Sequence, residues 1–335
     1  MLNLMKTLTA TCGISGREKA ISDKLLTLVA PLADKCGSDA MGNLIAVKYG
    51  TAPEADRKKV MLCAHMDEIG FLVNFIEESG LIRFAPIGGI NPVAAFYSTV
   101  TFENGVRGIL VPEKSDSKLS AAYVDIGARD RKDAERRVSI GDSFALTGHV
   151  QTLSRNVWAG RPLDDRIGCA ILVEAASRIT TTVDDLYFVF SVQEEVGCRG
   201  GKTAAASVLP DCGFALDVTG TGDAPGSGTM AVKRGGGAAV KLKDSSVICD
   251  PALVRGMLRL AEERKIPAQK EILERGGTDA SAIQLSGTGA RAGGISIPSR
   301  GIHSGVETVD RRDCNACVDL VCAIAEVGMD GLLAN

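Results

Sequence analysis

Hydrophobic residues recur along most of the chain with the spacings of helices and buried strands. Near the N-terminus, Ser15 and Glu18 have the spacing of a helix capping box. The apolar residues that follow share one face of a helix: Ile21, Leu25, Leu28, Val29 and Leu32. A continuous apolar run at Val60–Ala64 is typical of a strand buried on both faces of a sheet. The pattern predicts a helix followed by a buried strand.

From about Asp67 to His149 the pattern changes to short alternating runs. Turn-forming Gly, Pro, Asn and Asp residues separate these runs, which is typical of a small β-rich module. The predicted strands are Phe71–Ile76, Ser98–Phe102, Arg107–Val111 and Phe144–Thr147.

After Val150, longer helical patterns alternate with buried strands. The predicted elements are helices at Arg166–Ile179 and Leu253–Ala261, strands at Leu186–Val192, Phe214–Leu216 and Gly294–Ile297, and a closing helix with Cys317, Leu320, Val321 and Ile324 on one face. This alternation predicts a mixed or parallel α/β sheet flanked by helices. We expect residues 1–66 and 151–335 to form one α/β domain, with residues 67–150 as an inserted β-rich domain.

Composition narrows the class of protein. The 335 residues carry a net charge of −3 without clustered basic residues, so we expect neither nucleic acid nor a membrane surface as a partner. Apolar stretches are too short to span a bilayer, and Met1–Cys12, whose only basic residue is Lys6, does not resemble a signal peptide. The ten cysteines are scattered among apolar neighbours, as at Cys63, Cys169, Cys212 and Cys317, so we expect reduced core residues in a cytoplasmic protein.

Acidic residues and histidines gather where the predicted strands end. They are His65 and Asp67 after the first strand, Glu194 and Glu195 after the second, Asp217 after the third, and His303 after the fourth, with Asp164 and Asp165 just before a helix. Open α/β sheets place their sites at the carboxyl ends of strands, so these side chains are expected to share one crevice. Two of the three histidines in the chain belong to this set.

Each of these residues also has an ordinary structural interpretation. A lone His-x-Asp triplet is common in surface turns, and Glu194–Glu195 is also compatible with an exposed acidic turn. The pair Asp164–Asp165 suits a helix N-cap. Asp217 fits a turn, and His303 fits a polar loop.

The complete set favours a pair of divalent ions. Five side chains supply the ligands, one carboxylate being able to bridge: His65, Asp164, Glu195, Asp217 and His303. Imidazole and carboxylate donors suit Zn²⁺-like ions, and a bound hydroxide would complete charge neutrality with three carboxylates. Ions about 3.5–4 Å apart would lower the pKa of the water between them. Glu194 would then be free to act as general base and acid.

Six stretches in order resemble family 42 of the metallopeptidases, the glutamyl and tetrahedral aminopeptidases, some of which carry the label cellulase M. They are Ala64-His65-Met66-Asp67-Glu68-Ile69-Gly70, Leu163-Asp164-Asp165-Arg166, Gln193-Glu194-Glu195-Val196-Gly197, Ala215-Leu216-Asp217-Val218, Gly276-Gly277-Thr278-Asp279-Ala280 and Ile302-His303-Ser304. Together they span nearly the whole chain.

This resemblance implies specific roles. His65 and Asp217 would hold one ion, Glu195 and His303 the other, and Asp164 would bridge them. Asp67 would orient His65, and Glu194 would be the catalytic base. The choice of Asp164 over Asp165 rests on the family pattern alone. The resemblance also implies that the β-rich insert, expected to be barrel-like, mediates dimerisation, and that dimers assemble into a tetrahedral dodecamer.

The expected reaction is removal of N-terminal residues from small peptides by a metal-bridging hydroxide, with zinc or cobalt as the favoured metal and manganese as a further candidate. Alternatives are a deacylase or carboxypeptidase using the same metal pair, a glycosidase, and an inactive scaffold. Gly301 stands where the resemblance leads us to expect an aromatic residue, and Gly305 lies two residues after His303. Arg275 and Arg300 either attract an acidic substrate side chain or pair with local carboxylates.

Overall fold

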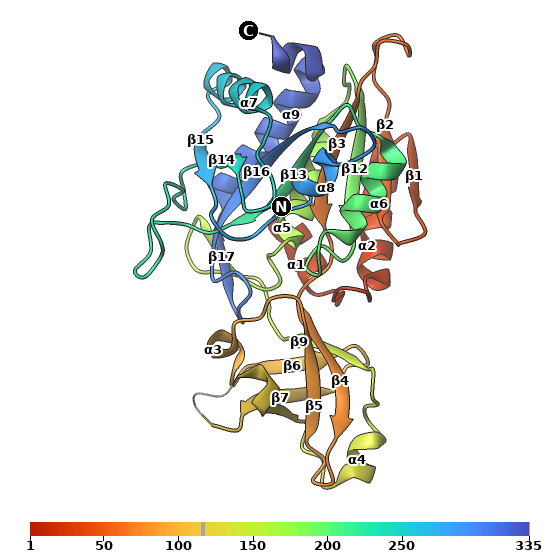
Figure 1. The fold of residues 1–335 in the computed structure, drawn as a ribbon, viewed down its shortest axis with the longest axis vertical. Helices are drawn as coiled ribbons and strands as arrows, with labels where there is room; N and C mark the ends of the chain where they lie inside the picture. Colours follow the sequence, from red (N-terminus) through yellow and green to blue (C-terminus); the bar gives the residue numbers. More distant parts are fainter. Residues whose placement is uncertain (115–117, 335) are drawn as a thin grey trace.

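The computed structural model describes residues 1–114 and 118–334. Figure 1 shows two parts: a large α/β body that contains both termini, and a small β-barrel below it. Each part has its own cluster of buried apolar side chains. The predicted fold class, a mixed α/β sheet with helices and an inserted barrel-like unit, is confirmed.

The large sheet is built around four mutually parallel strands. Its main path runs β1-β2-β12-β3-β13-β16-β17-β11-β10, and β14 and β15 join it beside β16. The bounds are β1 Lys35–Ser38, β2 Leu44–Lys48, β3 Lys59–His65, β10 Gln151–Thr152, β11 Val157–Gly160, β12 Asp185–Ser191, β13 Cys212–Thr219, β14 Ala238–Lys243, β15 Ala268–Ile272, β16 Arg291–Arg300 and β17 Glu307–Asp310. Strands β12, β3, β13 and β16 are parallel neighbours, so their carboxyl ends meet at one edge.

Helices cover the sheet because its central strands are apolar on both faces. Every residue of β13 is buried, as are all but the first of β3. The helices are α1 Leu2–Thr9, α2 Lys19–Val29, α5 Arg166–Arg178, α6 Arg199–Val208, α7 Pro251–Glu263, α8 Ala280–Gln284 and α9 Arg311–Leu333. In Figure 1, α6 and α8 lie on one side of the sheet and α5 and α9 on the other. None of the helices formed by the described residues has the length and apolar character needed to span a membrane.

The inserted unit is a closed antiparallel barrel. Its order is β4-β5-β8-β7-β6-β9, with bounds β4 Gly70–Ile76, β5 Ile82–Ile87, β6 Thr99–Phe102, β7 Arg107–Pro112, β8 Ala122–Asp125 and β9 Ser143–Leu146. Two short helices, α3 Pro92–Ala95 and α4 Arg131–Glu135, accompany it. Buried phenylalanines fill its centre, and the rings of Phe71 and Phe144 stack with centroids 5.0 Å apart. This aromatic core is separate from that of the large sheet.

The prediction of a capping box at the N-terminal helix is wrong. Helix α2 begins at Lys19, and no side chain caps it. The hydroxyl of Ser15 instead donates to Asp67 Oδ2 (2.6 Å), and Glu18 Oε1 accepts from the backbone N–H groups of Gly16 and Gln193. Residues that have capping spacing in the sequence therefore brace the segments around the candidate site.

Candidate active site

The predicted site residues meet at the carboxyl edge of the parallel strands. His65 ends β3, Glu194 and Glu195 follow β12, and Asp217 lies near the end of β13. Asp164 precedes α5, and His303 follows β16. The order β12-β3-β13-β16 makes these strands neighbours, which explains why residues distant in sequence reach one crevice.

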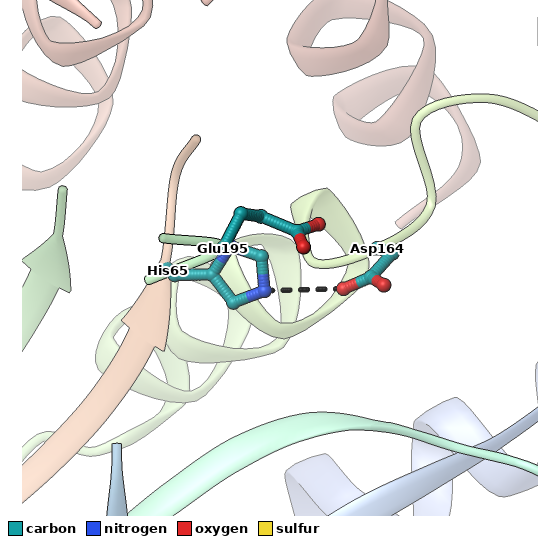
Figure 2. Close-up of side chains that lie close together, drawn as sticks. All are labelled: His65, Asp164 and Glu195. Atoms are coloured by element: carbon teal, nitrogen blue, oxygen red, sulfur yellow. Dashed lines mark hydrogen bonds and ion pairs between the residues drawn. The ribbon is translucent and has the colours of Figure 1, made fainter. Parts of the chain in front are cut away.

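Asp164 occupies the centre of this cluster. Its Oδ1 lies 3.1 Å from His65 Nε2, and its Oδ2 lies 3.2 Å from His303 Nε2. His303 Nε2 is also 3.0 Å from Glu195 Oε2, and His65 Nε2 is 3.8 Å from Asp217 Oδ1. Figure 2 shows His65 and Asp164 pointing toward each other, with the Glu195 carboxylate beside them. The structure therefore brings together all five side chains predicted to bind metal.

Asp67 organises the residues around the cluster. The ring nitrogen Nδ1 of His65 faces the backbone carbonyl of Asp67 at 3.1 Å, and a carbonyl can only accept, so Nδ1 carries the proton and Nε2 faces Asp164. The Asp67 carboxylate is fully buried and accepts from the backbone N–H groups of Glu194 (3.0 Å) and Glu195 (3.3 Å). Asp67 thus connects His65 to the segment that carries both glutamates.

Burial and close contact perturb the protonation of the cluster. Burial alone would lower the pKa of His65, but hydrogen bonds with Asp164 and Asp67 raise it well above its usual value. Burial would also lower the pKa of His303, but the carboxylates of Asp164 and Glu195 raise it to about 11. Burial raises the pKa of Asp217 well above its usual range. Contact with these carboxylates therefore favours the protonated form of both imidazoles.

The donor set fits divalent metal ions. Two groups of three residues could each hold an ion, because one ligand atom from each residue lies within 4.8 Å of the others in its group. They are His65–Asp164–Glu195 and His65–Asp165–Asp217, which share His65. Glu195 Oε1 is buried and has no hydrogen-bond partner, which is unfavourable unless a cation or water meets it. Imidazole nitrogens and carboxylate oxygens are ligands of Zn²⁺, Co²⁺ and Mn²⁺. The donor types therefore suit divalent metal ions, and one of the two groups contains Asp165 rather than the predicted Asp164.

The residue next to the cluster, Glu194, has an environment suited to exchanging a proton. Its Oε1 accepts from the Cys198 thiol at 3.1 Å. Burial raises the pKa of Glu194 to about 8, and the neighbouring carboxylates of Asp279 and Glu195 add to the shift. Glu194 also lines a cavity of about 510 Å³ that reaches the five-residue cluster.

Comparison with known proteins identifies the family. The family model described as M42 glutamyl aminopeptidase matches residues 42–320. A protein of Acetivibrio thermocellus is 43% identical over 326 residues, covering 96% of this chain and 97% of its own length. An aminopeptidase from the archaeon Desulfurococcus kamchatkensis has a TM-score of 0.95 at 33% identity, covering 99% of this chain and 96% of that one.

This chain belongs to the M42 peptidase family. It is an aminopeptidase-class enzyme, a hydrolase of peptide bonds. The Pyrococcus horikoshii TET1 peptidase, described as assembling into a tetrahedron or a large octahedral shell, has a TM-score of 0.85 at 31% identity, covering 97% of this chain and 98% of its own. These matches do not favour the deacylase, carboxypeptidase or inactive-scaffold alternatives.

Within this M42 chain, Asp164 and Asp165 occupy different environments. Asp164 lies between the two histidines, whereas one oxygen of Asp165 accepts from Gly168 N–H (3.1 Å) at the start of α5. Asp165 Oδ2 is buried without a partner. The helix-cap interpretation of the Asp-Asp pair therefore applies to Asp165, whereas Asp164 lies between His65 and His303.

Three residues near the site have no role in the sequence-based account. Glu307 accepts from the backbone N–H groups of Leu163 and Asp164, at 2.5 and 2.9 Å, and so holds the segment that presents Asp164. Cys198 and Asp279 lie beside Glu194. Asp279 belongs to a matched motif, which is a signal for it, but no pattern distinguishes Glu307 or Cys198 from ordinary polar residues.

The arginines and glycines near the site have different explanations. Arg300 pairs with Asp223 at 2.8 Å, so the local-carboxylate interpretation applies to it. Arg275 lines the cavity, and no carboxylate of residues 1–114 or 118–334 forms an ion pair with it. Gly301 has a φ of +76°, and a Cβ there would lie 2.4 Å from the Val306 carbonyl oxygen. This loop conformation excludes an aromatic residue at position 301.

Proposed function

We propose that this M42 enzyme removes N-terminal residues from peptides with two divalent ions held by the five-residue cluster. His65 and Asp217 would hold one ion, and Glu195 and His303 the other. The observation that carries this assignment is the position of Asp164, with one carboxylate oxygen near each histidine. A carboxylate so placed is suited to bridging two cations.

When bound, the ions would polarise the scissile carbonyl and lower the pKa of a water molecule. Glu194 would accept a proton from the attacking water and deliver it to the departing amine. Its place in the cavity wall and its hydrogen bond from Cys198 support this role. Asp67 would keep His65 oriented through the contact at Nδ1, as supporting groups commonly do in metal sites.

A substrate panel tests the reaction. The purified chain, with its metal content counted, would be given aminoacyl-nitroanilides, N-acylated amino acids, peptides with blocked N-termini, carboxypeptidase substrates and cellulosic substrates. We expect metal-dependent turnover of substrates with a free N-terminal amine only. Cleavage of acylated amino acids, or of C-terminal residues, would favour the deacylase or carboxypeptidase instead. A chain that binds no metal and turns over none of the substrates would favour the scaffold.

The same panel addresses the side-chain preference and the metal. Arg275 lines the cavity and has no ion-pair partner among the described residues. The panel should therefore include glutamyl, lysyl and leucyl substrates. A preference for the glutamyl substrate that is lost in Arg275→Gln would assign this residue to substrate binding. Loading with zinc, cobalt or manganese in turn would rank the metals by turnover.

We further propose that residues 67–150 form a dimerisation domain and that dimers assemble into a tetrahedral dodecamer. Large apolar side chains are exposed on this unit, including Val93, Tyr97 and Ile140, which supports a protein contact there. Light scattering should give twelve copies for wild-type protein. We also propose a cytoplasmic location, because all ten cysteines are free and six are buried.

A further inference from the structure

A second group of acidic and thiol side chains lies beside the same cavity, and two of its three members line the cavity wall. Glu194 follows β12, Cys198 precedes α6, and Asp279 precedes α8. One ligand atom from each residue lies within 4.8 Å of the other two. None of these three residues belongs to the five-residue cluster proposed above to hold metal.

Asp279 gives this group an unsatisfied acceptor. Its side chain is 3% exposed. Its Oδ2 accepts from the Ser191 hydroxyl (2.5 Å) and the Cys63 thiol (3.3 Å), whereas Oδ1 has no hydrogen-bond partner. A buried carboxylate oxygen without a partner is costly, and a bound cation would relieve that cost.

The donor types select the class of cation. One thiolate and two carboxylates suit thiophilic divalent ions, whereas Mg²⁺ and Ca²⁺ prefer oxygen alone. In a tetrahedral site, Zn–S bonds of about 2.3 Å and Zn–O bonds of about 2.0–2.2 Å place two ligands of one ion about 3.3–3.7 Å apart. Cys198 Sγ and Glu194 Oε1 already lie 3.1 Å apart. The other separations, all within 4.8 Å, would close by no more than about 1.5 Å on binding.

The group is accessible from the cavity. Glu194 and Cys198 both line it, and Asp279 lies behind them next to α6, where its Oδ1 faces the backbone of Gly201. An ion entering from the cavity would meet Glu194 and Cys198 first. Its remaining coordination position would face the cavity.

We propose that Glu194, Cys198 and Asp279 form a third divalent-cation site, selective for thiophilic ions such as Zn²⁺ and Cd²⁺, that inhibits the enzyme when filled. On binding, the Cys198 thiol loses its proton to solvent and the sulfur becomes a ligand. The Glu194 carboxylate is then engaged by the ion and is no longer free to accept a proton. This inhibition rests on the proposed function of Glu194; the binding of the ion does not.

The test uses the whole enzyme loaded with two equivalents of zinc per chain. Cd²⁺ is added while the ultraviolet charge-transfer absorption of a Cd–thiolate bond is recorded, and aminopeptidase turnover is measured in parallel against added Zn²⁺. We expect a saturable Cd–thiolate signal and inhibition by excess zinc. In Cys198→Ser the signal should disappear, and the zinc concentration for half-inhibition should rise by at least ~10-fold.

Cys36→Ser is the matched control, because Cys36 is also a half-buried free thiol but lies on β1, outside the cavity lining. It should give the wild-type signal and the wild-type inhibition. Asp279→Asn keeps the size of the side chain and should weaken cadmium binding, with circular dichroism and Tm verifying that the variant is folded. A Cd–thiolate signal that persists unchanged in Cys198→Ser would overturn the third site.

The two proposals fail in different ways. If the enzyme cleaves none of the peptide substrates, the proposed function is wrong, and the cadmium signal still decides whether the third site exists. If excess zinc inhibits wild type and Cys198→Ser equally, the inhibitory role of this site is wrong even when Cys198 binds cadmium.

Discussion

At the scale of single residues, Glu194 is held at both its backbone and its carboxylate. Its N–H donates to Asp67 Oδ1 (3.0 Å), and its Oε1 accepts from Cys198 (3.1 Å). Glu194→Gln keeps the shape of the side chain and removes its ability to accept a proton. We predict a fall in kcat of ~10²–10⁴-fold with metal content unchanged, measured by steady-state kinetics and elemental analysis.

Glu262→Gln provides the control for this variant, because Glu262 is an exposed glutamate on α7, remote from the cavity lining. It should retain the wild-type kcat. Wild-type turnover in Glu194→Gln would remove Glu194 from proton transfer.

The protonation of the two histidines predicts how metal binding depends on pH. In the metal-free chain the neighbouring carboxylates hold the pKa of His303 at about 11 and that of His65 well above its usual value, so both rings are protonated at pH 7. A metal ion binds the neutral ring, so binding must expel protons. Apparent metal affinity should therefore fall as the pH is lowered.

Calorimetric titration of metal into metal-free protein, repeated in buffers of different ionisation enthalpy, measures this exchange. We expect net proton release at pH 7. Binding without proton release would show that the metal does not displace protons from His65 and His303.

Some contacts of single residues at the site could not be predicted from the sequence. Asp164 and Asp165 differ in which carboxylate turns toward His303. Two adjacent identical residues carry no sequence signal for that difference. The bracing role of Glu307 depends on two backbone N–H groups far away in the chain. Such contacts arise from tertiary packing rather than from local pattern.

At the scale of helices and strands, continuous or periodic apolar runs were sufficient to predict the elements that are buried along a whole face. The run Val60–Ala64 lies within β3, and the closing helix corresponds to α9. The predicted helix at Leu253–Ala261 lies within α7, where Asp250 caps the first turn. These elements are buried along a whole face, so the pattern records their environment directly.

Short or interrupted elements were missed. Strand β5 contains Arg83 and Pro86, and β8 is four residues long, so neither stands out as an apolar run. Helix α6 begins with Arg199, Gly200 and Gly201, which have weak or unfavourable signals for a helix start. Closure of the barrel and packing against neighbouring strands stabilise these segments, and neither is visible in a local window.

A buried ion pair between strands gives a prediction at this scale. Lys241 on β14 places its Nζ 2.5 Å from Glu271 on β15 and 3.6 Å from Asp244, and all three side chains are almost fully buried. Lys241→Met would leave two buried carboxylates without their cation. We expect the free energy of unfolding to fall by about 3–5 kcal/mol, measured by chemical denaturation.

Lys243→Met, on the same strand but exposed, should change the free energy of unfolding by less than about 0.5 kcal/mol. Equal losses in the two variants would show that the buried pair contributes nothing specific to the fold.

At the scale of the whole molecule, one sheet edge explains both the fold and the chemistry. The chain leaves this edge after His65 to build the barrel, and it returns through β10 and β11 to place Asp164 beside the histidines. The barrel has its own aromatic core, so it can vary its surface without disturbing the parallel strands. The site therefore depends on the large sheet rather than on the barrel.

The central claim is that five side chains hold two ions in one crevice. Anomalous diffraction from crystals of zinc-loaded protein, recorded on both sides of the zinc absorption edge, tests it most directly. The account predicts two zinc peaks on either side of Asp164, one near His65 and Asp217 and the other near Glu195 and His303. A single peak, or no peak on one side of Asp164, would contradict it.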